Sequence, residues 1–245
     1  MALSFGLGLP PAPKKGGFSL ARFMASQADG FWYDFGLVSS LSQDTAGATP
    51  VTVFGDMIGR VVDRRTGANS PRNATQATTS LKPKYQATGG AFDGSDDNLL
   101  STFSAGVGAN FLIAKATIPA SVPSTQTMIG AAGAGVDRFR LEINSAGQLQ
   151  WGVGSLVTSV AGDLRGQTIT AGLTMDGTNL AVFLGASQVH SGAQSGVPTT
   201  AFPVRIGANN AAATVSQFFA GSIKAALAGR QFLDLTTFKK IAAAL

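Results

Sequence analysis

Four oxygen-bearing side chains stand close together in the middle of the chain. Asp93, Asp96, Asp97 and Asn98 lie within six positions. Such oxygens are the ligands that Ca²⁺ takes, several at a time. The pattern also fits a turn at Asp93 and Gly94, with Asp96 or Asp97 accepting hydrogen bonds from the backbone amides that follow. The sequence therefore predicts a capped turn or a calcium site, and favours the turn; the spacing does not match an EF-hand.

Side chains for catalysis are scarce. A retaining glycosidase needs two carboxylates on one face, whereas Glu142 is the only glutamate and Asp137 lies five residues before it. His190 is the only histidine, and no nucleophile-elbow motif accompanies it. The chain has no cysteine, which excludes a thiolate nucleophile or thiolate metal site. We therefore expect a protein that is not an enzyme and has no cofactor, apart from the calcium considered above.

Three further residues are candidates for contacts with a sugar. An exposed aromatic ring can stack on a pyranose, and Trp151 stands in an expected strand. Asn209 and Asn210 follow a later apolar run and could bind hydroxyl groups. The alternative is core packing for Trp151 and a turn for the two asparagines, and for Trp151 the core is the favoured interpretation.

Composition narrows the class of partner. Hydrophobic residues make up 44% of the chain and charged residues only 13%, with a formal net charge of +5. Basic residues are scattered instead of clustered among aromatic residues, which argues against nucleic-acid binding. No apolar run approaches the roughly 20 residues of a membrane-spanning helix, so we expect no membrane insertion. At the start of the chain positive charges follow the apolar stretch, unlike a secretory signal, and we expect assembly in the cytoplasm.

The chain divides into three parts. Residues 1–30 are expected to form an extended arm with a short helix capped by Ser19. In the arm Leu3, Phe5, Leu7 and Leu9 alternate with small residues, which suits a strand laid against another subunit, or equally a terminus without fixed structure. Residues 31–88 are rich in turn formers and predict an irregular segment, with short strands around 51–54 and 58–62.

Residues 89–245 show short apolar runs separated by turn residues. Asp176-Gly177 and residues 144–147 have the chemistry of hairpin turns. Residues 234–245 predict a helix capped by Thr236. The predicted fold is all-β, a two-sheet antiparallel jelly-roll sandwich with an extended N-terminal arm and a short C-terminal helix. Its expected strands cover residues 110–118, 125–130, 138–143, 149–153, 168–175, 179–184, 204–206 and 218–228.

Several motifs together resemble a known family. They are LSQDTAGATPV at 41–51, GDMIGRVVDRR at 55–65, FDGSDDNL at 92–99 and TAGLTMDGTNLAVFLGASQVHSG at 170–192. The chain resembles phage and prophage virion proteins of the concanavalin A-like, laminin-G-like superfamily of lectins and glucanases. The resemblance implies a structural role in the virion, as a tail fibre, tail tip or capsid decoration. It also implies repeated copies of the chain and other virion proteins as partners. The alternative is a phage lectin that recognises a host surface glycan, with or without Ca²⁺.

Overall fold

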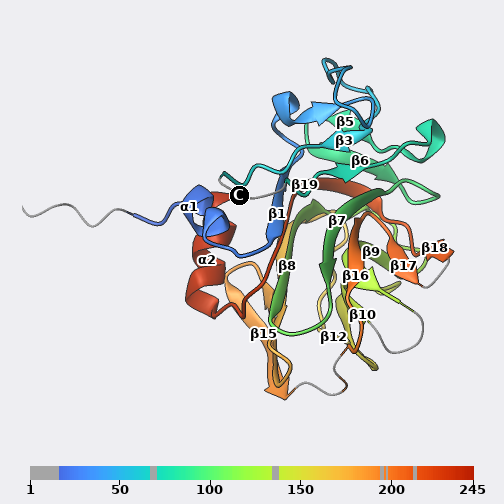
Figure 1. Cartoon of the computed structure of the whole chain (residues 1–245). Coiled ribbons are helices and arrows are strands. Elements are labelled where there is room, and N and C mark those ends of the chain that lie inside the picture. The colour runs from blue at the N-terminus through green and yellow to red at the C-terminus, as the bar shows by residue number, and fades with distance from the viewer. Residues whose placement is uncertain (1–16, 67–70, 134–137, 194–195, 197, 212–213) are drawn as a thin grey trace, which may run out of the picture.

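The computed structural model describes residues 17–66, 71–133, 138–193, 196, 198–211 and 214–245. Two antiparallel sheets pack face to face, and two helices lie beside one of them (Figure 1). The all-β jelly-roll sandwich predicted from the sequence is therefore confirmed. No helix among the described residues is long and apolar enough to cross a membrane.

The first sheet, sheet A, carries the helices on its outer face. Its eight strands lie in the order β15-β14-β13-β8-β19-β6-β5, and β1 pairs with the other end of β19. Their bounds are β1 Gly30–Asp34, β5 Lys84–Gln86, β6 Gly89–Asp93, β8 Asn110–Thr117, β13 Thr168–Met175, β14 Asn179–Leu184, β15 Ser187–Ala193 and β19 Ala220–Gly229.

The second sheet, sheet B, lies on the other side of the core. Its nine strands lie in the order β12-β11-β10-β9-β16-β7-β4-β3-β2, and a separate hairpin follows β16. Their bounds are β2 Leu41–Ser42, β3 Arg60–Val61, β4 Ala74–Thr75, β7 Leu99–Ala105, β9 Gln126–Ala132, β10 Arg138–Ile143, β11 Leu149–Val153, β12 Leu156–Ser159 and β16 Phe202–Ile206, with β17 Asn209–Ala211 and β18 Thr214–Ser216 in the hairpin.

Alternation along the strands builds the core between the sheets. In β7 the side chains of Leu99, Phe103 and Ala105 point inward and are fully buried. In β10 the side chains of Phe139 and Leu141 also point inward, so the side chain of Arg140 between them faces outward. Each sheet therefore has an outer face whose residues can be read from the register of the strands.

The helices cover the outer face of sheet A. Helix α1 spans Leu20–Ala25, and the Ser19 side chain accepts a hydrogen bond from the Arg22 amide, as predicted. Helix α2 spans Leu235–Ala244, and the residue that caps it is Asp234 rather than the predicted Thr236. Asp234 lies one position before the helix, where its carboxylate can reach the Thr237 amide.

The segment 31–88 is more ordered than its turn-rich sequence indicates. Gly30–Asp34 forms β1 of sheet A, and β2, β3 and β4 extend sheet B. The strand predicted around 58–62 is present as β3, Arg60–Val61, but the strand predicted around 51–54 is wrong. There the Asp56 carboxylate accepts hydrogen bonds from the Thr52 and Val53 amides and closes a turn. Two 3-10 turns complete the segment, at Val38–Ser40 and Thr79–Leu81.

Candidate functional site: the acidic loop between the sheets

The acidic loop joins sheet A to sheet B. It comprises residues 93–98, between the end of β6 and the start of β7. Gly94 has a φ of +80°, a conformation that favours glycine and reverses the chain sharply. The Asp93 carboxylate accepts hydrogen bonds from the Ser95 amide at 2.8 Å and the Asp96 amide at 3.3 Å. The predicted turn at Asp93 and Gly94 is therefore present, but the amides that follow it are capped by Asp93 itself and not by Asp96 or Asp97 as predicted.

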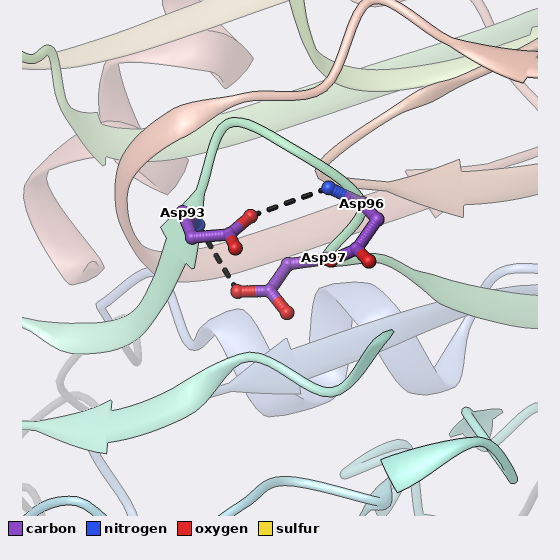
Figure 2. A group of neighbouring side chains, drawn as sticks. All are labelled: Asp93, Asp96 and Asp97. Carbon is purple, nitrogen blue, oxygen red and sulfur yellow. Dashed lines mark hydrogen bonds between the residues drawn. The ribbon is translucent and has the colours of Figure 1, made fainter. Parts of the chain in front are cut away.

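The same turn brings three carboxylates together. Asp93, Asp96 and Asp97 each offer a carboxylate oxygen, and these oxygens all lie within 4.8 Å of one another. Figure 2 shows Asp97 turned back beneath the loop, where its carboxylate accepts a hydrogen bond of 3.0 Å from the Asp93 amide. The two interpretations of the sequence are thus compatible, because capping the backbone leaves other carboxylate oxygens available.

Asp97 is the unusual member of this group. Only 6% of its surface is exposed, whereas Asp93 is exposed. Burial, together with the negative charges of Asp93 and Asp96, raises the pKa of Asp97 to about 6, while the hydrogen bond from the Asp93 amide and the charge of Lys84 act in the opposite direction. The loop therefore concentrates more negative charge than its surroundings compensate.

A cavity of about 320 Å³ opens beside the acidic loop. Asp93 and Asp97 line one side, and β5 contributes Lys84 and Gln86 on the other. The remaining lining residues are Met57, Ser80, Lys82, Ala91 and Phe92. The cavity thus combines acceptors, donors and apolar surface, which is the chemistry that orients a polyol.

The carboxylates suit a hard cation. Ca²⁺ takes six to eight oxygen ligands, of which three could come from Asp93, Asp96 and Asp97 and the rest from backbone carbonyls or water. The pKa of Asp97 is raised by burial and by repulsion from Asp93 and Asp96, and a divalent charge would offset both. The residues present therefore fit calcium.

Sequence reasoning did not find the cavity residues Ser80, Lys84 and Gln86. Lys84 and Gln86 alternate around Tyr85 in a three-residue strand, which is too short to give a periodic signal. They reach the acidic loop only because β5 pairs with β6, with Lys84 opposite Ala91.

The other predicted sugar-binding residues lie elsewhere. Trp151 is 1% exposed and packs in the core, with its ring centroid 5.1 Å from that of His190, so its face is not free to stack on a sugar. Asn209 is buried and donates a hydrogen bond to the Gln217 side chain at 2.9 Å. Asn210 pairs through its backbone with Val215 in the β17-β18 hairpin. Neither Trp151 nor Asn209 lines the cavity beside the acidic loop.

The remaining predicted residues have no part in this site. Glu142 is fully buried in sheet B and is bound by Thr127, Gln150 and Arg140. The candidate assembly residues Leu3, Phe5, Leu7 and Leu9 lie outside the described residues.

No known family model matches the chain, and no curated protein matches it. Among solved structures, a Trypanosoma rangeli sialidase in complex with 2,3-difluoro-KDN is similar over 85% of this chain, with 13% identity and a TM-score of 0.56. The match spans 36% of that sialidase. At this identity the likeness shows the fold alone.

Two smaller domains give weaker matches. The Ruminococcus gnavus IT-sialidase CBM40 covers 57% of this chain and 83% of its own length, with 16% identity and a TM-score of 0.47. A heptameric SAP-like pentraxin from Limulus polyphemus covers 62% and 80%, with 15% identity and a TM-score of 0.47.

Proposed function

We propose that this chain is a non-enzymatic carbohydrate-binding protein that holds a sugar in the cavity beside its acidic loop, with Ca²⁺ at Asp93, Asp96 and Asp97. The observation that carries this proposal is the convergence of three carboxylates at the wall of a cavity.

The cavity has the size and chemistry for a small glycan. Small-molecule sites commonly measure about 300–1,000 Å³, so a cavity of about 320 Å³ suits one or two sugar rings. Asp93 and Asp97 can accept hydrogen bonds from sugar hydroxyls, and Lys84 and Gln86 can donate them. Met57 and Ala91, which are both partly exposed, supply apolar surface for the ring carbons.

Calcium would complete the site in two ways. It would neutralise the carboxylates, and it would offer open coordination positions to sugar hydroxyls. Asp97 supports this role because burial and the charges of Asp93 and Asp96 raise its pKa and so disfavour its negative form in the absence of a cation.

The non-enzymatic part of the proposal rests on the state of the candidate catalytic groups. Glu142 is buried and fully engaged by its three partners. His190 lies in β15 against the ring of Trp151, and Trp151 belongs to the core. Neither group faces the cavity beside the acidic loop.

A glycan array probed with the purified protein tests this proposal. We expect binding of neutral glycans in Ca²⁺ that is lost in EGTA and in Asp97→Asn, a variant that keeps an oxygen for the Asp93 amide. Asp163→Asn is the matched control, because Asp163 is exposed and pairs with Arg165 away from the cavity. Binding of neutral glycans that survives both EGTA and Asp97→Asn would remove the acidic loop from the site. Hydrolysis of a bound glycan would refute the non-enzymatic assignment.

A second candidate function is structural, as a repeated subunit of a phage virion assembled in the host cytoplasm. The motifs at 41–51, 55–65 and 92–99 favour it, and so does an exposed apolar patch in the segment between the first two. Val53 and Phe54 are 61% and 66% exposed there, and Phe54 lies against Tyr85.

Cryo-electron microscopy of the purified particle tests this role. Density for the sandwich at a defined position, with residues 1–17 against a neighbouring subunit, would support it. A chain absent from particles would refute it.

A further inference from the structure

A row of arginines crosses the outer face of sheet B. Because paired residues on neighbouring antiparallel strands point to the same face, the register can be followed from strand to strand. Gly152 of β11 pairs with Arg140 of β10, Arg140 with Gly130 of β9, and Gly130 with Arg205 of β16. The row continues through Leu100 and Thr75 to Arg60 of β3.

Arg140 is held in this row by its surroundings. Both of its neighbours across the strands are glycines, and a Cβ at Gly130 would lie 2.6 Å from the Arg140 Cβ. A Cβ at Gly152 would lie 3.1 Å from Arg140 Nε. The Arg140 side chain therefore packs on the backbone of its two glycine neighbours, and Arg140 is only 8% exposed.

Glu142 orients Arg140 without using all of its donors. Glu142 Oε1 lies 3.0 Å from Arg140 Nε, as an ion pair rather than a well-aligned hydrogen bond, since Nε has no hydrogen-bond partner. Among the described residues, no acceptor binds the two terminal nitrogens of Arg140. Glu142 itself is occupied by Thr127 and Gln150. The guanidinium thus keeps its terminal donors for another group.

Positive charge prevails around Arg140. Arg138 lies two residues before it on the same face, and Arg205 lies two strands away in the same row, about 10 Å from it by strand spacing. Arg205 is held at the opposite side by Asn98 of the acidic loop. Glu142 is the only acid that the described parts of β9, β10, β11 and β16 place on this face.

We infer that the outer face of sheet B, centred on Arg140 and flanked by Arg138 and Arg205, is a second binding site, for a glycan that carries a carboxylate or sulfate group. The planar guanidinium fork matches both anions and binds them through two parallel hydrogen bonds. That the anion belongs to a glycan rests on the carbohydrate-binding function proposed above. This site is distinct from the cavity beside the acidic loop and does not require Ca²⁺.

Titration calorimetry with three ligands on one scaffold tests the inference: lactose, 3′-sialyllactose and 3′-sulfolactose, at about 150 mM salt to limit nonspecific attraction. The wild-type protein should bind at least one of the two anionic ligands about tenfold or more tightly than lactose, with EGTA present. The sialylated and sulfated ligands then distinguish the two anions.

The variants separate this site from the fold and from the acidic loop. Arg140→Gln combined with Glu142→Gln removes the guanidinium without leaving a buried charge alone, and should abolish the preference for the anion. Arg138→Gln should weaken the preference, whereas Arg22→Gln, an exposed arginine on α1, should leave it unchanged. Asp97→Asn should also leave it unchanged.

Four results would overturn the inference. Equal affinity for lactose and for both anionic ligands would do so, as would a preference that survives the Arg140→Gln, Glu142→Gln double variant. Loss of binding in Asp97→Asn alone would assign the glycan to the acidic loop, so that the proposed function stands and this site falls. If a single-stranded oligonucleotide competes through the same arginines and binds more tightly, the face serves nucleic acid instead.

Discussion

Replacing Asp97 by asparagine should stabilise the protein at neutral pH. In the folded state the pKa of Asp97 is raised from 3.8 to about 6, mainly by burial and then by Asp93 and Asp96. The folded protein therefore holds this proton more tightly than the unfolded chain does. It follows that Asp97 has no destabilising effect below pH 3.8, becomes destabilising between pH 3.8 and 6, and stays so at higher pH. Asparagine is neutral throughout and escapes this cost.

The size of the effect follows from the shift. Each pKa unit corresponds to about 1.4 kcal/mol, so a rise from 3.8 to about 6 sets an upper value of about 3 kcal/mol above pH 6. Relaxation and water around the loop reduce this figure, and we expect a gain of about 2 kcal/mol for Asp97→Asn at pH 7.5. For a chain of 245 residues this raises Tm by about 4–8 °C.

Urea unfolding of both proteins in EGTA, at several pH values from 3.5 to 8, measures this difference. The difference in unfolding free energy should grow between pH 4 and 6 and then level off. Adding Ca²⁺ should stabilise the wild-type protein and narrow the gap. Asp163→Asn is a control of opposite sign, because Arg165 lowers the pKa of Asp163 and this carboxylate stabilises the fold above pH 4. A difference that is flat with pH, or a destabilised Asp97→Asn, would refute the reasoning.

Three other substitutions test the packing, each by urea or thermal unfolding. Phe238→Ala should lower the unfolding free energy by about 3–5 kcal/mol, because the buried Phe238 ring stacks on that of Phe183 between α2 and sheet A, with the ring centroids 4.7 Å apart. A loss below about 1 kcal/mol would mean that α2 does not pack there. Tyr33→Phe should cost about 1–2 kcal/mol through the lost hydrogen bond of 2.7 Å to Ser101, and an unchanged stability would contradict it. Glu142→Ala should lower the unfolding free energy by about 3–5 kcal/mol, because it leaves the buried Arg140 without its counter-charge and Thr127 and Gln150 without their acceptor. Glu142→Gln should cost less, because it keeps an acceptor oxygen, and an equal cost would contradict this.

Local patterns in the sequence were sufficient to predict the bounds of several strands. The strands predicted at 138–143, 149–153, 168–175 and 179–184 have the observed bounds. Their apolar runs end at turn residues such as Asp176-Gly177, so both ends are marked within the run itself. The turn at Asp93 and Gly94 was predicted for the same reason, because a short polar side chain and a glycine act on the adjacent amides.

Residues whose side chains suit two environments were harder to assign. Trp151 can stack on a sugar or fill a core, and its burial depends on which face of β11 turns inward. Gly30–Asp34 could not be predicted as a strand, because its partner β19 lies near the other end of the chain. No periodicity within residues 30–34 indicates a pairing with a strand so distant in sequence.

The sequence by itself therefore determined the all-β class, most strand positions, the two helices and the clustering of Asp93, Asp96 and Asp97, since each depends on neighbours along the chain. Only the tertiary structure decided the cavity beside the acidic loop and the row of Arg140, Gly130 and Arg205. Both depend on the register between strands distant in sequence, and that register is set by how the two inner faces pack against each other.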